Sequence, residues 1–335
     1  MNILVTGGAG FIGSHLVEHH LAKKDKVYVV DDLSTGTLDN IKPFKENPDF
    51  KFKKANILTC PGLIEAAAWA DRIYHMAAVV GMFRVLAEPV KVLAINTSGT
   101  ERLLRSVSES AKNPEVIIAS SSEVYGTNNS HEFREDTNLT ISEGGGPRWS
   151  YAISKLSAEL FGLAYARING LNVTVVRLFN TIGPRQTGRY GMVVPRFVEK
   201  AVSGKPITIF GDGLQSRSFC DVRDIINALD MLASNPETKG EVFNVGNDRS
   251  ISIQELAEIV KVRSNSSSSF EYIPYEKVYG KEYADIHFRK PSLKKLFEFT
   301  GFKPKWKLEE TLDQLISEHS NLPKNSRANM SRVNI

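Results

Sequence analysis

The sequence predicts an α/β protein built on a Rossmann-type, doubly wound parallel sheet, with a smaller α/β lobe toward the C-terminus. Two observations lead to this fold class. Apolar runs suited to strands alternate with segments of helical length through the first 180 residues, and this repeated β-α-β order is typical of a parallel sheet. Beyond residue 180, glycine and proline separate shorter elements, which is typical of a second, irregular lobe.

The individual elements follow from this alternation. The predicted strands cover residues 2–6, 27–30, 71–75, 115–119 and 172–178. The predicted helices between them cover residues 11–22, 60–68, 85–111 and 150–168. An apolar run near 240–246 predicts one more strand that returns to the same sheet, and the polar run 264–269 predicts a mobile loop. The tail 321–335 lacks a periodic apolar face, so we expect it to be disordered.

Composition excludes several classes of protein. The 335 residues carry a formal net charge of only +4 with scattered basic residues, so neither nucleic acid nor a membrane is expected as a partner. Cys60 and Cys220 form no metal or redox motif and are expected to be reduced thiols. No apolar run reaches the ~18 residues of a membrane span, and Met1-Asn2 runs directly into the first strand. These features predict a cytoplasmic protein.

A glycine-rich turn joins the first predicted strand to the first predicted helix. The glycines are Gly7, Gly10 and Gly13, spaced Gly-x-x-Gly-x-x-Gly. The first permits a tight turn, the second lets the backbone approach a pyrophosphate, and the third lets the helix pack close to the sheet. The helix N-terminus then faces the phosphates, so the turn predicts a dinucleotide site. The alternative is a glycine-rich turn that binds nothing.

Two acidic residues indicate which dinucleotide is bound. Asp31 and Asp32 end the second predicted strand, about 20 positions after the glycine turn, where a carboxylate grips the adenosine ribose. A carboxylate at this place repels a 2′-phosphate. The sequence therefore predicts NAD rather than NADP as the cofactor.

Tyr151 and Lys155 are the first part of a candidate catalytic group. They stand four residues apart on a predicted helix and hence on one face, where the ammonium would lower the pKa of the phenol. The alternative is a surface pair on an amphipathic helix. The second part, Ser121-Ser122-Glu123, directly follows a predicted strand, and ligands of open α/β sheets bind at the carboxyl ends of strands. Its alternative is a serine-rich turn.

Taken together, these motifs resemble the extended short-chain dehydrogenases/reductases of the nucleotide-sugar epimerase, dehydratase and decarboxylase type. The resemblance covers nearly the whole chain. The matching segments are Thr6–Gly13, Asp31–Ser34, His75–Ala78, Ser121–Gly126, Tyr151 with Lys155, Arg177–Asn180, Gly183–Arg185, Gly211–Gly213, Arg217–Phe219 and Asn244–Gly246.

The resemblance implies roles for these residues. Tyr151 would take the proton of the substrate 4-hydroxyl, Lys155 would lower its pKa and hold the nicotinamide ribose, and Ser121 would hydrogen-bond the reacting oxygen. Asn180 and Arg217 would hold the nucleotide diphosphate. Residues 1–180 would bind NAD, and 181–320 would mainly bind the nucleotide sugar, which is expected to be UDP-linked. The NAD-binding residues would be Gly7, Gly10, Phe11, Ile12, Gly13, Asp31, Asp32, Asn56, Ile57, Ala77, Ala78, Tyr151 and Lys155.

One position departs from the family pattern. The family usually carries Gly-Asp-Ile where this chain has Ala55-Asn56-Ile57, with the acid at the adenine. The Asn56 amide both donates and accepts hydrogen bonds, so adenine binding is expected to survive.

The residues around the hydride step decide the reaction. Family dehydratases carry an Asp-Glu pair before Val-Tyr-Gly, whereas this chain has Ser122-Glu123, as the UDP-glucuronate decarboxylases do. The segment 279–292 also resembles those enzymes, with Arg289 at the place of a catalytic arginine and Tyr283 as a further substrate contact. Oxidation of C4 in a hexuronate gives a β-keto acid that loses CO2 readily. Arg289 could hold the carboxylate, while Glu123 and Ser122 could manage protons on the enolate.

Alternatives to UDP-glucuronate decarboxylation remain open. A UDP-sugar 4-epimerase comes second and a 4,6-dehydratase third; a non-catalytic NAD-binding scaffold is the alternative from a different class.

The pattern His15-Leu16-Val17-Glu18-His19 resembles an inverted zinc protease motif, but the glycines already explain this helix, so no metal is expected. In the family, helices equivalent to 85–111 and 150–168 pair two subunits in a four-helix bundle, so a homodimer is expected. The leucines at helical spacing on them are Leu93, Leu103, Leu104, Leu156, Leu160 and Leu163.

Overall fold

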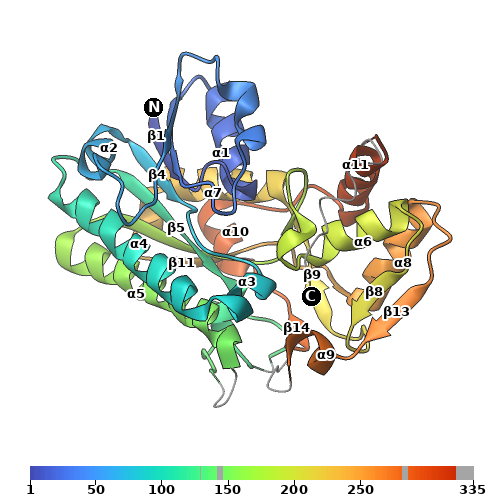
Figure 1. Cartoon of the computed structure of the whole chain (residues 1–335). Helices are drawn as coiled ribbons and strands as arrows, with labels where there is room; N and C mark the ends of the chain where they lie inside the picture. The colour runs from blue at the N-terminus through green and yellow to red at the C-terminus, as the bar shows by residue number, and fades with distance from the viewer. Residues whose placement is uncertain (129, 142–145, 281–285, 322–335) are drawn as a thin grey trace.

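The structure, a computed structural model, describes residues 1–128, 130–141, 146–280 and 286–321. Its centre is a seven-stranded sheet in the order β11-β6-β5-β4-β1-β2-β3, with every neighbouring pair parallel (Figure 1). The doubly wound fold class is therefore confirmed. The strands are β1 (Asn2–Thr6), β2 (Lys26–Asp31), β3 (Phe50–Lys54), β4 (Arg72–His75), β5 (Glu115–Ser121), β6 (Asn172–Leu178) and β11 (Val242–Val245).

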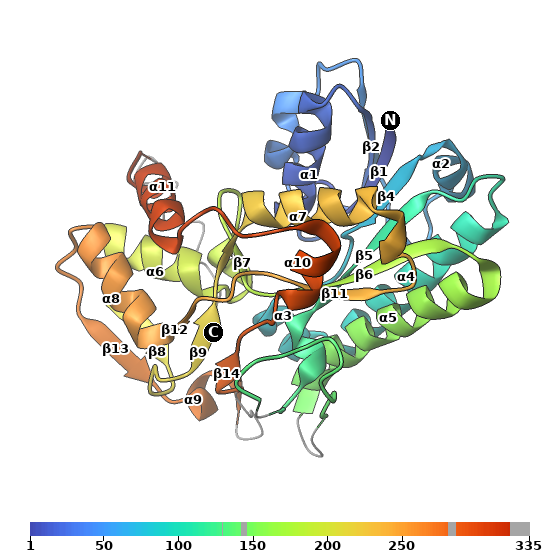
Figure 2. The same ribbon diagram turned by 180° about the vertical axis from the view of Figure 1, so that it is seen from behind.

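Helices cover both faces of this sheet, as a parallel sheet requires. One layer contains α2 (Leu63–Trp69), α4 (Pro89–Glu109) and α5 (Trp149–Asn169), and the opposite layer contains α1 (Phe11–Ala22), α7 (Val222–Ser234) and α10 (Lys294–Thr300) (Figure 2). Two of these helices, α7 and α10, come from residues beyond 180 and return to the sheet. Strand β11, which the sequence predicts to return to this sheet, also comes from beyond residue 180.

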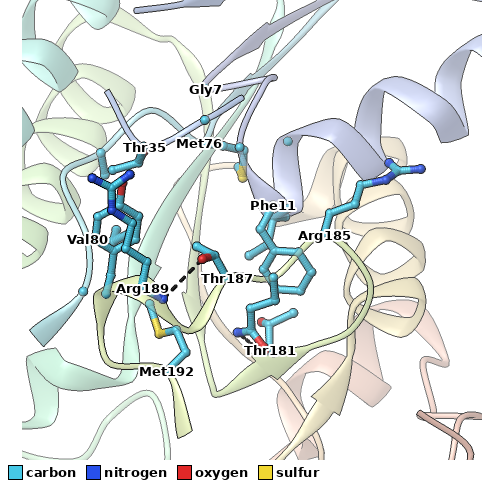
Figure 3. Close-up of a pocket in the computed structure, with 18 of the residues that line it drawn as sticks. Gly7, Phe11, Thr35, Met76, Val80, Thr181, Arg185, Thr187, Arg189 and Met192 are labelled. Atoms are coloured by element: carbon cyan, nitrogen blue, oxygen red, sulfur yellow. Dashed lines mark hydrogen bonds between the residues drawn. The ribbon is translucent and has the colours of Figure 1, made fainter. Parts of the chain in front are cut away.

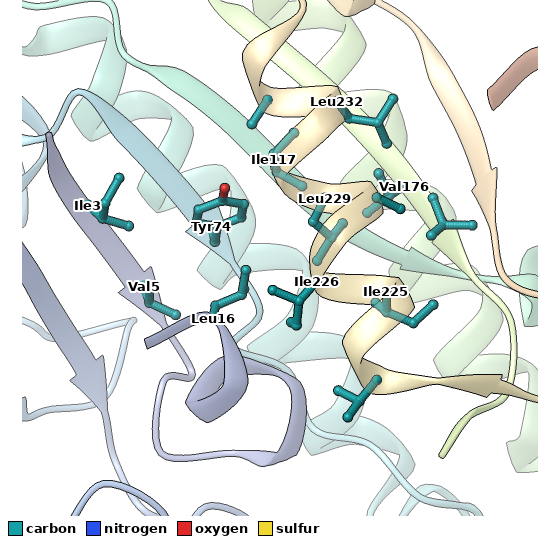
Figure 4. Close-up of a cluster of buried hydrophobic side chains, with 14 of the residues drawn as sticks. Ile3, Val5, Leu16, Tyr74, Ile117, Val176, Ile225, Ile226, Leu229 and Leu232 are labelled. Atoms are coloured by element: carbon teal, nitrogen blue, oxygen red, sulfur yellow. The ribbon is translucent and has the colours of Figure 1, made fainter. Parts of the chain in front are cut away.

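The core on the α7 side shows how this return is held. Ile225, Ile226 and Leu229 of α7 are fully or almost fully buried against Val176 of β6 and Ile117 of β5 (Figure 4). Burying a side chain of this size stabilises the fold by about 1.5–3 kcal/mol. The sheet therefore depends on apolar residues that are far apart in the sequence.

The remaining elements form a second group with its own apolar cluster, beside the carboxyl ends of the sheet strands. Its helices are α6 (Val193–Val202), α8 (Ile253–Arg263), α9 (Tyr275–Tyr279) and α11 (Leu308–Asn321). Its strands pair as β8 (Ile207–Phe210) with β13 (Phe270–Ile273), β7 (Thr181–Ile182) with β10 (Cys220–Asp221), and β9 (Ser216–Ser218) with both β12 (Ser250–Ser252) and β14 (Phe288–Arg289).

The structure differs from the predicted elements in three places. Strand β3 was not predicted, because it has only two apolar residues, Phe50 and Phe52, between lysines and lacks the continuous apolar run by which the other strands were recognised. The predicted helix 85–111 is two helices, α3 (Met82–Ala87) and α4, because Pro89 starts α4. The loop 264–269 is held in place: Ser266 donates a hydrogen bond to the Ala201 carbonyl at 2.7 Å.

Four further expectations concern other parts of the chain. Leu103 and Leu104 are fully buried in the core under α4, so they do not belong to an outer face of that helix. Both cysteines are free thiols and buried. No helix in the described ranges has the length and apolar character needed to cross a lipid bilayer. The tail predicted to be disordered lies, apart from Asn321, outside the described residues.

Candidate active site

A cavity of about 1190 Å³ lies where the carboxyl ends of the sheet strands meet the second group of elements. Its walls come from both parts of the chain. In Figure 3, Phe11 of α1 lies near Thr181 and Arg185, whereas Thr35 and Val80 lie near Arg189 and Met192. Ligands of open α/β sheets bind at this edge, so the cavity is the candidate active site.

The glycine turn forms one end of the cavity. Gly7 has a φ of +75°, and a Cβ at this residue would lie 2.7 Å from the Ala77 nitrogen. A Cβ at Gly13 would lie 2.2 Å from the Gly7 carbonyl oxygen, so α1 packs directly against the turn. Gly10 caps the N-terminus of α1. The turn is therefore a cradle that side chains would fill, and it fits the pyrophosphate of NAD.

The two acids after β2 lie at the same end. Asp31 accepts hydrogen bonds from the Ala9 and Leu33 nitrogens at 3.0 and 2.7 Å, and burial raises its pKa. Asp32 accepts one at 2.9 Å from the Asn56 amide. Asn56 is thus partly committed to Asp32 rather than wholly available to an adenine. Asp31, Asp32 and Asn56 line the cavity. The other residues predicted to bind NAD after the glycine turn also line it: Phe11, Ile12, Ile57, Ala77 and Ala78.

Tyr151 and Lys155 lie on the first two turns of α5 and both line the cavity. The Lys155 ammonium lies 6.0 Å from the Tyr151 ring centroid and donates to the Ala119 carbonyl at 2.8 Å. Burial lowers the pKa of Lys155 to about 8. Burial also raises the pKa of Tyr151, and a hydrogen bond with Ser121 opposes this rise. The sequence predicts that Lys155 lowers the pKa of Tyr151. Among the described residues, Lys155 does not contribute to the shift of this pKa.

Glu123 pairs with two arginines in the same cavity. Its Oε1 accepts a hydrogen bond from Arg289 at 2.6 Å, and its Oε2 accepts one from Arg148 at 3.3 Å. Burial alone would raise the pKa of Glu123, but the charges of Arg289 and Arg148 overcome this effect and lower the pKa to about 2. Glu123 is therefore a carboxylate at neutral pH and has no proton to donate. In this structure Glu123 is the ionised partner of Arg289, and its expected part in moving protons on the enolate stays a prediction.

Arg148 was missed as a site residue. It immediately precedes α5 and stands three positions before Tyr151. This spacing could have indicated that Arg148 lies close to Tyr151. Glu123 belongs to the 3-10 turn Ser122–Tyr125 after β5. Its contact with Arg148 therefore depends on how the fold brings this turn beside the start of α5. Ser122 of the same turn is buried and lines the cavity.

The residues predicted to bind substrate are placed unevenly. Asn180 lines the cavity and donates from its amide to the Ser218 carbonyl at 2.9 Å. Arg217 lies outside the lining and donates to the Ser216 carbonyl at 2.8 Å, but it pairs in register with Arg289 across β9 and β14. Tyr283 lies outside the described residues.

The histidine motif on α1 makes contacts with protein groups. His15 contacts the Pro184 carbonyl oxygen at 3.0 Å, and His19 contacts the Asp230 carboxylate at 3.0 Å. Asp230 also forms ion pairs with Lys23 and Arg72. Within the described residues, His19, Lys23 and Arg72 thus share the Asp230 carboxylate.

Comparison with known proteins places the chain among nucleotide-sugar enzymes. The family model described as "NAD dependent epimerase/dehydratase family" matches residues 3–246. A UDP-N-acetyl-alpha-D-glucosaminuronate decarboxylase of Bacillus cytotoxicus is 36% identical over 314 residues, covering 93% of this chain and 96% of the relative. UDP-glucuronic acid decarboxylase 1 of Arabidopsis thaliana is 34% identical over 321 residues, covering 96% and 70%.

Solved structures agree in fold. UDP-glucuronic acid 4-epimerase from Bacillus cereus, in complex with UDP-glucuronic acid and NAD, superposes with a TM-score of 0.85 at 27% identity, covering 95% of this chain and 99% of that one. The dTDP-glucose 4,6-dehydratase DesIV from Streptomyces venezuelae, with NAD bound, gives 0.85 at 27% identity, covering 95% and 96%. The predictions of an enzyme and of NAD as cofactor are confirmed at the level of the family. The chain belongs to the NAD dependent epimerase/dehydratase family.

Proposed function

We propose that the protein is an NAD-dependent decarboxylase of UDP-linked hexuronates, with UDP-glucuronate as the first substrate to test. The observation that carries the proposal is the pair of buried arginines, Arg148 and Arg289, around Glu123 in the cavity that holds Tyr151. A neutral sugar offers only hydroxyl groups to such a cluster, whereas a hexuronate also offers a carboxylate for a charge-assisted hydrogen bond. Decarboxylases of UDP-hexuronates are also among the relatives that the chain matches over more than nine-tenths of its length.

The chemistry assigns a task to each group. NAD, when bound, accepts the hydride from C4 of the sugar, which makes the acid a β-keto acid. Tyr151 takes the proton of the 4-hydroxyl, with Ser121 as its hydrogen-bond partner. Lys155 keeps a positive charge beside the phenol, since its pKa of about 8 leaves it protonated at neutral pH. The arginines would orient the C6 carboxylate until CO2 leaves, and the resulting enolate would take up a proton. The hydride held by the cofactor would then return to C4, so that the net change is the loss of CO2.

The lobes of the molecule share the two ligands in this proposal. Residues 1–180 hold NAD through the glycine cradle and Asp31, while residues 181–320 mainly hold the nucleotide sugar. Asn180 sits at the boundary between the two ranges and lines the cavity. Arg217 lies on β9, the strand beside β14, which carries the cavity residue Arg289. Both are suited to the diphosphate, Arg217 by charge.

A homodimer is part of the same proposal. The outer faces of α4 and α5 carry apolar side chains with large exposed fractions, which soluble monomers seldom gather on adjacent helices. The two helices pack side by side, so that a second copy could complete a four-helix bundle. The exposed residues are Val90, Leu93, Ile153, Leu160 and Ile168.

The test is a panel of nucleotide sugars incubated with the purified protein and NAD. UDP-glucuronate should lose the mass of CO2, and UDP-N-acetylglucosaminuronate is tested beside it because the Bacillus cytotoxicus relative acts on that acid. UDP-glucose and dTDP-glucose are the neutral controls. A product of unchanged mass with inverted C4 would establish a 4-epimerase instead, and loss of water would establish a dehydratase. Absence of any turnover with bound NAD would favour a scaffold.

A further inference from the structure

A single buried amide connects the two segments that carry Glu123 and Arg289. Asn244 lies on β11 and is fully buried. Its side-chain oxygen accepts a hydrogen bond from the Tyr125 hydroxyl at 2.8 Å, and its side-chain nitrogen donates one to the Phe133 carbonyl at 2.9 Å. These three residues are not among the described residues that line the cavity, so they can influence the site only through the residues that they hold in place.

Tyr125 is the contact on the Glu123 side. It belongs to the same 3-10 turn as Glu123, and its buried ring stacks on the Phe133 ring with the centroids 4.6 Å apart. The Tyr125 hydroxyl accepts a hydrogen bond from Arg177 at 3.0 Å, and an arginine can only donate. The hydroxyl therefore gives its own proton to Asn244, which fixes the orientation of the Asn244 amide.

Phe133 is the contact on the Arg289 side. Its nitrogen donates to the Lys290 carbonyl at 2.8 Å, and its carbonyl accepts from the Ser292 nitrogen at 2.7 Å. These two bonds hold the chain directly after Arg289 of β14. The Phe133 carbonyl thus accepts two hydrogen bonds, one from Ser292 and one from the Asn244 amide.

The amide of Asn244 therefore bridges both partners of the ion pair in the cavity. Glu123 and Arg289 are 166 positions apart in the sequence, yet their side chains lie 2.6 Å from each other. A leucine would fill the place of Asn244 with nearly the same volume, but it would make no directional bond to either segment. A buried polar network in which every group is paired holds its members in one arrangement, and it loosens when one donor is lost.

We propose that Asn244 is a positioning residue: through Tyr125 and Phe133 it fixes where Arg289 lies relative to Glu123, and hence where the site receives a carboxylate. This inference rests on the proposed function only in taking an acidic sugar as the ligand of Arg289. It goes beyond that function by assigning the placement of Arg289 to an amide that acts through two other residues.

The test measures binding, so that it does not depend on turnover. Dissociation constants for UDP-glucuronate and UDP-glucose are determined by calorimetry on the NAD-loaded Tyr151→Phe protein, and their ratio gives the preference for the acid. Asn244→Asp keeps the oxygen that accepts from Tyr125 but turns a second oxygen toward the Phe133 carbonyl, and two acceptors repel each other. The preference should fall by about tenfold or more, because a hydrogen bond to a charged group contributes roughly that factor. The affinity for NAD should be retained.

Asn235→Asp is the matched control. The Asn235 amide also donates to a backbone carbonyl, that of Phe299 at 2.8 Å, and accepts from a backbone nitrogen, that of Glu237 at 2.9 Å. Asn235 ends α7 and is not among the described residues that line the cavity. This variant should lower Tm and leave the preference unchanged. An equal fall of the preference in both variants would indicate general loosening of the fold and overturns the inference.

A second variant approaches the network from the Glu123 side. Tyr125→Phe keeps the ring on Phe133 but removes the hydrogen bond to Asn244, so the preference should fall by about threefold or more, as expected for one neutral hydrogen bond. This variant decides the matter if Asn244→Asp does not fold. An unchanged preference in Tyr125→Phe then overturns the inference.

The outcomes for the two proposals differ. An unchanged preference in folded Asn244→Asp overturns the inference, even if the wild type releases CO2 and the proposed function stands. A Tyr151→Phe parent without any preference for the acid also overturns it. A wild type that prefers the acid but never releases CO2 overturns the proposed function, while the loss of preference in Asn244→Asp would still support the inference.

Discussion

Replacing Gly13 by alanine is the sharpest test of the cofactor cradle. The added Cβ would lie 2.2 Å from the Gly7 carbonyl oxygen and 2.8 Å from the Gly8 Cα. Both neighbours are backbone atoms of the turn, so no side-chain rotation relieves the contact. Either α1 moves away from the sheet or the turn opens, and both displace the amides that face the pyrophosphate.

The size of the effect follows from two opposing contributions. Alanine in the interior of a helix is favoured over glycine by about 1 kcal/mol. Overpacking costs about 1–3 kcal/mol and occasionally more, and a contact this short lies at the upper end. We expect a net loss of about 1–2 kcal/mol in unfolding free energy, or roughly 2–8 °C in Tm at about 2–4 °C per kcal/mol. We also expect the affinity for NAD to fall by at least about tenfold, which corresponds to about 1.4 kcal/mol.

The assay combines NAD titration with thermal unfolding in the presence and absence of NAD. Gly10→Ala should cost less stability, because its Cβ would lie 3.1 Å from the Gly7 oxygen. Gly162→Ala is the helical control: its Cβ would meet the end of the Ile118 side chain at 2.8 Å, away from the cradle, so it should cost stability while leaving NAD affinity unchanged. If Gly13→Ala binds NAD within twofold of wild type, the cradle argument is refuted.

Three further results are expected. Tyr151→Phe should lower turnover by about 10²–10⁴-fold with NAD affinity retained, and residual activity well above a hundredth of wild type would exclude Tyr151 as the base. Wild type should bind NAD far more tightly than NADP in a direct titration, and Asp31→Ser should narrow that gap; equal binding by wild type would count against Asp31. Burial lowers the pKa of His20 to about 4 and that of His75 to about 3, so the unfolded chain binds more protons between pH 4 and pH 6.5 and stability falls as the pH decreases through this range. His20 should account for about 2 kcal/mol of this loss of stability between pH 8 and pH 5. His20→Gln should therefore remove roughly half of the pH-dependent fall in Tm. If Tm falls with pH as steeply in this variant as in wild type, the prediction is wrong.

Local patterns were sufficient for six of the seven strands of the sheet and for the cradle. The glycine turn, the acids after β2 and the Tyr151–Lys155 spacing each lie within one short segment, where chain geometry alone decides what can meet. The edge strand β3 was missed because it is not a continuous apolar run: an exposed edge tolerates lysines between its two phenylalanines. The break at Pro89 is visible in the sequence, but the apolar periodicity on both sides concealed it.

The charge cluster could not be predicted in the same way. Glu123 and Arg289 are separated by more than 160 positions, and their ion pair depends on how β14 is placed beside β9. Each residue by itself fits a role toward substrate, and only their mutual contact shows that Glu123 is held ionised. The state of a buried acid depends on its neighbours in space, which the order of residues does not give.

The attachment of β14 has a consequence for protein engineering. Arg289 pairs in register with Arg217 of β9, while the next residues are tied to the other part of the chain: Phe133 donates from its nitrogen to the Lys290 carbonyl at 2.8 Å and accepts from the Ser292 nitrogen at 2.7 Å. A chimera that exchanges only the second group of elements would therefore separate Arg289 from one of its two supports. To transfer recognition of a sugar acid onto another scaffold, the segments around Phe133 and Arg289 would have to be grafted together.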